Sequence, residues 1–315
     1  MSKTILSFYC DDTTPYGLPG DAFQAFLQFV SSEGIAGESS VILGSGAETH
    51  GLLSRPRTDP QRAFIAQVQR AYECGLDTHM ELMTHGGLYD FERGCVPVDA
   101  VHEGLWLHEP DVRPEEYEAY FEHIIDEGAE AGVRFTGLTW PGCGCEACTR
   151  RYGELHQRGI TSPNPNVWSA LLRLARRGKF RCRTVPCFVH PDEDLSGPLL
   201  QASDGPYGVY DLIANAGDWF GTWENDPARV SADYYISSPG DSGRIVDLVR
   251  AGCPYCVFYA HWQGLNPANG VGWSAFREVV ARVRRFLGDQ VVWMRPTDIT
   301  DQYHLGHGGA QPARA

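Results

Sequence analysis

The feature that most constrains the fold is a regular alternation of strand-like and helix-like segments along nearly the whole chain. Strand-like segments are short and rich in β-branched and aromatic residues, whereas helix-like segments repeat apolar residues every three or four positions. The expected strands are 4–9, 39–44, 78–85, 134–139, 183–189, 219–223, 256–261 and 291–294. The expected helices are 21–32, 60–74, 115–131, 167–177, 207–216, 242–251 and 275–287. Roughly seven or eight strand–helix units without a break in composition predict an α/β fold, a single (β/α) barrel rather than two separate sheets.

Composition narrows the class of protein. The 315 residues are 43% hydrophobic, which is enough for one large core in residues 1–305, and the Gly/Ala/Pro-rich segment 306–315 is expected to be a disordered tail. A net charge of −14 argues against nucleic acid and against anionic membranes as partners. The first apolar run is too short for a signal peptide, and no later run approaches ~18 residues, so we expect a cytoplasmic protein.

Polar residues fall at the ends of the expected strands, where the active sites of (β/α) barrels lie. Asp11 and Asp12 directly follow the first strand, and adjacent carboxylates repel unless a cation or a shared proton relieves them. His85, the turn at Trp140-Pro141 and His261 also end strands. The alternative for the two aspartates is a turn or a helix cap, because Asp is common in both.

The segment 78–85 carries a row of polar side chains. A period of two places His79, Glu81, Met83 and His85 on one face, which indicates a lined cavity. The long irregular segment 88–114 that follows is expected to be an insertion over the active site.

Four short motifs, in this order, resemble those of the polysaccharide deacetylases, the nodulation-protein-B-like family, of which the chain would be a divergent member. They are the strand ending in Asp11-Asp12, the strand ending in Glu81 to His85, the strand entering Pro141-Gly142 and the strand ending in His261. The resemblance implies a distorted (β/α) barrel that removes N- or O-acetyl groups from sugars with a divalent metal. It implies that Asp11 is the general base, that Asp12 and His85 are metal ligands, and that His261 is the general acid.

The residues support these roles independently. A carboxylate and an imidazole can hold zinc, the expected ion, or another divalent cation, which lowers the pKa of a bound water to about 7. The sequence departs from the family at Tyr89, where a second ligand histidine is usual. His79 and His102, and also His108, are the candidates for the missing ligand.

Substrate contacts are expected from four residues near strand ends, Glu81, Trp140, Pro141 and Trp262. The flat rings of the two tryptophans can stack on sugar faces. The alternative for each tryptophan is packing in the core.

The cysteines provide a second motif. Cys143, Cys145 and Cys148, spaced C-x-C-x-x-C after a strand end, can place three thiolates around one tetrahedral ion. We expect a structural zinc at this loop, separate from the catalytic ion. Ten cysteines in 315 residues are otherwise too few for a disulfide scaffold.

These observations give a leading hypothesis and two alternatives. The leading hypothesis is a metal-dependent hydrolase that removes an acyl group from a small sugar or glycoconjugate. The first alternative is a glycoside hydrolase that pairs Asp11 or Asp12 with Glu81, and the second is a non-catalytic carbohydrate-binding barrel. The sugar, the acyl group and the oligomeric state remain open.

Overall fold

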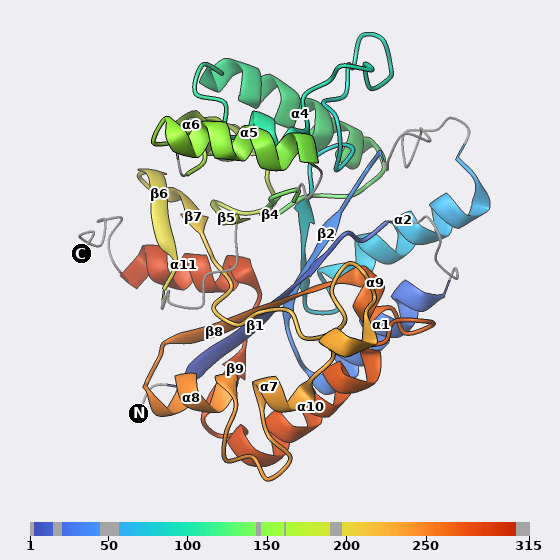
Figure 1. Ribbon diagram of the computed structural model, residues 1–315, viewed down its shortest axis with the longest axis vertical. Helices are drawn as coiled ribbons and strands as arrows, with labels where there is room; N and C mark the ends of the chain where they lie inside the picture. The colour runs from blue at the N-terminus through green and yellow to red at the C-terminus, as the bar shows by residue number, and fades with distance from the viewer. Residues whose placement is uncertain are drawn as a thin grey trace.

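The computed structural model describes residues 3–14, 21–44, 57–142, 146–160, 162–189 and 197–306. One or two helices separate most successive strands in these ranges, whereas the three strands between residues 184 and 211 follow one another with no described helix between them (Figure 1). The strands are β1 Thr4–Asp11, β2 Gly37–Val41, β3 Leu76–Met80, β4 Gly137–Thr139, β5 Thr184–Phe188, β6 Leu199–Asp204, β7 Tyr207–Asp211, β8 Tyr255–His261 and β9 Val291–Trp293. The helices are α1 Ala22–Glu33, α2 Asp59–Ala71, α3 Glu103–Trp106, α4 Pro114–Glu130, α5 Glu146–Gln157, α6 Pro165–Arg176, α7 Ala232–Tyr235, α8 Arg244–Arg250, α9 Trp262–Leu265, α10 Trp273–Leu287 and α11 Pro296–Gly306, with a 3-10 turn η1 at Pro227–Arg229.

The strands form two sheets. One has the order β8-β1-β9 and the other the order β2-β3-β4-β5-β7-β6, and every pair is parallel except the β6–β7 hairpin. Isolated parallel bridges join Thr13 to Val41 and Ala216 to Phe258. The predicted α/β class is therefore confirmed. A single closed barrel is not shown, because in the described part of the chain isolated bridges, not continuous ladders, connect the two sheets.

Two expected elements have a different type in the structure. The segment 207–216, predicted as a helix, begins with strand β7, and 219–223, predicted as a strand, contains only the bridge of Phe220 to Val230. A short run such as Tyr207 to Tyr210 fits either type of structure, and its pairing with β5 and β6 decides for the strand.

Strand β1 lies at the centre of the molecule, beside β8 (Figure 1). Its residues are all buried, and their side chains alternate between two cores. Tyr9 stacks on Phe188 of the other sheet with ring centroids 4.3 Å apart, and Phe8 packs against Phe258 and Phe276 on the opposite face. This packing fixes the end of the strand that carries the two aspartates.

Helix α11 is hydrogen-bonded to the beginning of β3. Thr297, in its first turn, donates from its backbone N–H and its hydroxyl to the buried carboxylate of Asp77 in β3, at 2.7 and 2.8 Å. Helix α11 ends at Gly306, and residues 307–315 of the expected tail lie outside the described residues. None of the described helices is long and apolar enough to cross a membrane.

Candidate functional site

The end of β1 is the starting point of the site. Asp11 is the last residue of the strand and is in register with His261, the last residue of β8. Asp12 then adopts a left-handed backbone, with φ of 66°, which Asp tolerates better than most residues. Its backbone N–H donates to Glu81 Oε2 at 2.8 Å and to Ser40 Oγ at 3.1 Å, so the turn is attached to the neighbouring strands.

The side chains of Asp12, Glu81 and His85 converge. One ligand atom from each lies within 4.8 Å of the other two, and His85 Nε2 is 3.3 Å from Asp12 Oδ1 and 3.2 Å from Glu81 Oε1. Glu81 is 1% exposed and Asp12 8%. Two carboxylates and one imidazole suit Zn²⁺, Mn²⁺ or another divalent ion. The donor set therefore fits the expected metal, with Glu81 as the third ligand in place of a second histidine.

The ionisation of this cluster is coupled. Burial raises the pKa of Asp12 to about 6, and the charge of Glu81 acts in the same direction. Burial alone would lower the pKa of His85, but its hydrogen bond to Glu81 and the charges of Glu81 and Asp12 raise it to about 10. The imidazolium thus balances the two carboxylates, as a divalent cation at the same place would.

Asp11 lies beside the cluster as a separate acid. Its side chain is buried, and its Oδ1 has no hydrogen-bond partner among the described residues. Burial raises the pKa of this carboxyl well above its usual range, and the charges of Glu81, Glu38 and Asp12 add to the effect. A buried carboxylate oxygen without a protein partner is a place where a ligand or a water is expected.

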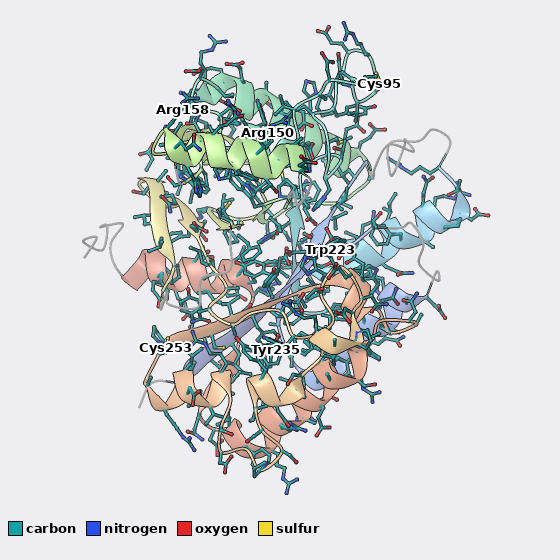
Figure 2. The ribbon with its side chains drawn as sticks, viewed as in Figure 1. Cys95, Arg150, Arg158, Trp223, Tyr235 and Cys253 are labelled. Carbon is teal, nitrogen blue, oxygen red and sulfur yellow. The ribbon has the colours of Figure 1, made fainter. Side chains whose placement is uncertain are left out.

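His261 forms a dyad with Asp218. Its Nδ1 is 2.8 Å from Asp218 Oδ2, which leaves Nε2 for a ligand. Burial would lower the pKa of His261, but the hydrogen bond to Asp218 and the charges of Asp12, Asp218 and Glu81 raise it. Tyr235 (Figure 2) donates its hydroxyl to the Gly217 carbonyl and accepts from the Trp219 N–H, so it holds the backbone on both sides of Asp218.

Asp218 and Gln263 were not identified from the sequence. Gln263 Nε2 donates to Asp12 Oδ2 at 3.1 Å. Asp218 is 43 residues from its partner, and no spacing rule relates the two. The position of Gln263, two residues after a strand-terminal histidine, is the only sequence signal that could have included it.

The other candidate histidines lie outside the cluster. His79 is fully buried, contacts Thr139 Oγ1 at 3.2 Å, and burial lowers its pKa to about 3. His102 accepts a hydrogen bond from the Gly104 N–H and so caps α3, and burial lowers its pKa to about 4. His108 contacts the Gly104 carbonyl oxygen at 3.0 Å.

The expected strand 78–85 is shorter in the structure, and Glu81, expected to contact the substrate, lies just after its end. β3 ends at Met80, and Leu82 and His85 have φ of 53° and 52°. The chain therefore leaves the period of two, and a turn rather than a strand face brings Glu81 and His85 together.

The expected aromatic contacts are mostly core residues. Trp262 is 1% exposed and packs edge-on against Phe23 and Phe26. Trp140 is 4% exposed and lies edge-on to His108. Pro141 follows it and is also buried. A stacking role for these rings stays a prediction.

Of the cysteine loop, only Cys148 is described; Cys143 and Cys145 lie outside the described residues. Cys148 is buried near the start of α5, and its sulfur is in a disulfide. Because a disulfide sulfur is not a thiolate, the prediction of a structural zinc applies to the reduced loop.

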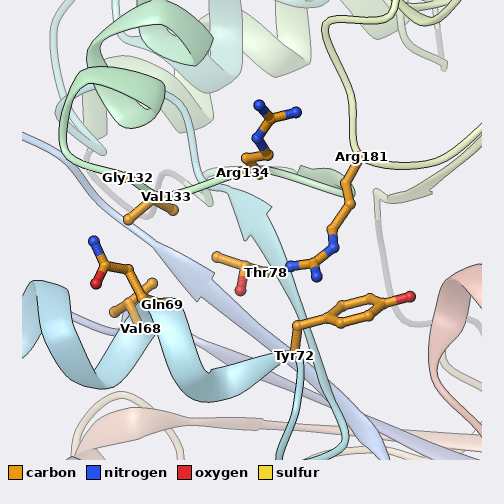
Figure 3. A pocket seen from close by; sticks show the side chains of 8 residues that line it. All are labelled: Val68, Gln69, Tyr72, Thr78, Gly132, Val133, Arg134 and Arg181. Carbon is orange, nitrogen blue, oxygen red and sulfur yellow. The ribbon is translucent and has the colours of Figure 1, made fainter.

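A separate cavity of about 320 Å³ lies between the α2 region and β3 (Figure 3). Val68, Gln69 and Tyr72 of the α2 region line one side, and Thr78 and Arg181 line another. Thr78 points to the opposite face from His79, its neighbour in β3. None of the eight lining residues is acidic, so this cavity is distinct from the carboxylate cluster.

Comparison with known proteins assigns no family. No protein-family model and no curated protein matches the sequence. Among solved structures, a deacetylase with substrate has a TM-score of 0.43 at 10% identity, over 96% of this chain and 92% of that one. A 4-α-glucanotransferase from Thermococcus litoralis scores 0.46 at 11% identity, over 96% and 41% of the two chains. A GH113 β-1,4-mannanase scores 0.41 at 10% identity, over 90% and 99%. With every score below 0.5, these likenesses support neither a family nor an activity.

Proposed function

We propose that the protein is a divalent-cation-dependent hydrolase that removes an acyl group from a small carbohydrate. The observation that carries the proposal is the convergence of Asp12, Glu81 and His85 within 4.8 Å, beside the strand-terminal pair Asp11 and His261. The cation would be held by those three side chains. When bound, it supplies Lewis-acid polarisation of an acyl carbonyl and of an attacking water.

The neighbouring residues supply the proton transfers. With a cation beside it to offset the neighbouring negative charges, Asp11 would be ionised, and its buried Oδ1, which has no hydrogen-bond partner among the described residues, could accept the proton of the attacking water. His261 keeps Nδ1 on Asp218, so its Nε2 can donate a proton to the departing amine or alcohol. Asp11 and His261 are in register at the ends of adjacent strands, which supports this pairing of acceptor and donor.

The geometry favours acyl hydrolysis over glycosidic hydrolysis. In most glycoside hydrolases two carboxyl groups face each other across a cleft, about 5 to 10 Å apart. Here Asp12 and Glu81 approach the same imidazole nitrogen, and Glu81 is almost completely buried. The choice of acetylated sugars as substrates rests on the ordered motifs around Asp11-Asp12, His85, Pro141-Gly142 and His261.

The test measures metal content and acetate release on the same protein, purified without chelator. We expect about one divalent ion per chain at this site and metal-dependent release of acetate from a panel of N- and O-acetylated sugars. Asp12→Asn keeps the size of the side chain and removes its charge. It should lose the ion and lower turnover by at least about 10²-fold, whereas Asp99→Asn, at an exposed aspartate, should change neither.

Three outcomes would contradict the proposal. A protein without a divalent ion, whose Asp12→Asn variant is as active as wild type, would refute it. Release of new reducing ends without acetate would favour the glycoside hydrolase. Sugar binding without turnover under any divalent ion would favour the binding protein.

A further inference from the structure

A buried carboxylate in the segment between β3 and α4 holds the turn that carries His85. Glu103, the first residue of α3, is 0% exposed. It accepts hydrogen bonds from three successive backbone N–H groups, of Met83 at 3.0 Å, Thr84 at 3.1 Å and His85 at 2.9 Å. The hydroxyl of Tyr120 in α4 donates to it at 2.5 Å.

The turn depends on such an acceptor. Leu82 and His85 both have left-handed backbones, which cost energy in residues other than glycine and persist only where surrounding contacts fix them. The N–H groups of Met83, Thr84 and His85 are not in a sheet ladder, and a buried N–H without a partner costs about 1 to 3 kcal/mol. The carboxylate of Glu103 satisfies three of them at once.

The contact between the two segments is reciprocal. The Glu103 N–H donates to the Gly86 carbonyl at 2.6 Å, and Gly87 pairs with His102 in an antiparallel bridge. Helix α3 also sits close to the end of β4, because a Cβ added at Gly104 would lie 2.3 Å from the Pro141 carbonyl oxygen. Both ends of the 86–103 segment are therefore anchored to the turn.

From these contacts we infer that Glu103 is a positioning residue for the cation cluster: it fixes the backbone of His85 so that Nε2 faces Asp12 and Glu81. This inference rests on the proposed function. Residues that orient a ligand without touching the ion change metal affinity by about 10- to 100-fold when replaced. Glu103 acts through the backbone of the ligand rather than through its ring.

The decisive variant is Glu103→Gln. The side chain keeps its size, but in either orientation the amide NH₂ faces at least one backbone N–H that the carboxylate accepted. Tyr120→Phe leaves the three backbone hydrogen bonds to Glu103 in place; it removes the fourth donor to Glu103 and the acceptor of the Tyr89 N–H. Glu92→Gln, at an exposed position of the same segment, is the matched control.

The probe is Co²⁺, titrated into the metal-free full-length protein and followed by its visible absorption. We expect Glu103→Gln to weaken Co²⁺ binding at least about tenfold and to alter the spectrum, Tyr120→Phe to weaken it less, and Glu92→Gln to match wild type. Wild-type affinity and spectrum in a folded Glu103→Gln protein would overturn the inference. If that variant does not fold, Glu103→Asp takes its place, because it keeps the charge but is too short to reach all three N–H groups; wild-type Co²⁺ affinity and spectrum in Glu103→Asp would overturn the inference.

A second measurement separates this inference from the proposed function. The ¹⁵N resonances of the His85 imidazole report its surroundings without any added ion. They should shift in Glu103→Gln and not in Glu92→Gln, whether or not the wild-type protein binds Co²⁺. Wild-type protein that binds no Co²⁺ refutes the proposed function, and unchanged His85 resonances in Glu103→Gln refute the positioning role.

Discussion

At the scale of single residues, the site consists of charged groups that burial alone would neutralise. Asp12 sits at a left-handed position where its carboxylate is 3.3 Å from His85 and its other oxygen accepts from Gln263. His261 is held by Asp218 in the same way that carboxylates orient imidazoles in many catalytic sites. Asp12 and His261 thus each have a hydrogen-bond partner that orients the side chain and affects its pKa.

The Asp218–His261 dyad predicts a change in the pH dependence of turnover. The charge of Asp218 raises the pKa of His261, which as a general acid must be protonated. Asp218→Asn should therefore move the alkaline limb of the rate profile to lower pH and reduce turnover by about 10²-fold. His261→Gln should reduce turnover at least as much, with a much smaller change in KM.

The measurement is the pH profile of kcat on an acetylated sugar, with Asp289→Asn, at an exposed position, as the control. An alkaline limb that stays in place in both Asp218→Asn and His261→Gln would make His261 a packing residue.

At the scale of elements, the contact between β3 and α11 links stability to pH. Burial raises the pKa of Asp77 from 3.8 to about 7, although hydrogen bonds from Thr297 and the charge of Arg295 lower it. The folded protein therefore binds this proton more tightly than the unfolded chain. The stabilisation that comes from binding this proton is complete below about pH 4 and is lost as the pH rises through about 7.

Asp77→Asn removes this titration and keeps the shape of the side chain. Between pH 4 and pH 8 the unfolding free energy of wild type should fall relative to that of the variant, by on the order of 4 kcal/mol for a shift of about three units. Urea unfolding at several pH values measures the difference. Two curves that stay parallel across this range would show that Asp77 does not titrate between the folded and unfolded states.

The elements also show where sequence patterns were sufficient. The helices near 21–32, 60–74, 115–131, 167–177 and 275–287 were predicted from apolar periodicity, and the structure has α1, α2, α4, α6 and α10 there. The predicted end of the third strand was wrong. The sequence pattern was read as a strand from His79 to His85, whereas the backbone leaves the strand after Met80 and turns at Leu82. Local sequence patterns do not predict the hydrogen bonds from Met83, Thr84 and His85 to Glu103 that stabilise this turn.

At the scale of the whole molecule, the strand ends bring distant residues to one place. Asp11, Asp12, His85 and His261 were predicted as one site because they follow expected strands, and the structure places Asp12 against His85 and Asp11 in register with His261. The partner of His261 and the exclusion of His79 could not be predicted, since both depend on tertiary packing.

The central claim is that Asp12, Glu81 and His85 bind one divalent cation, and anomalous X-ray diffraction at the cobalt edge tests it most directly. Crystals of the protein with bound Co²⁺ should show a strong peak within ligand distance of Asp12, Glu81 and His85, at roughly 2.0 to 2.2 Å from their donor atoms. The same peak should be absent from Asp12→Asn crystals. No peak at this cluster in wild type at saturating Co²⁺ would contradict the account.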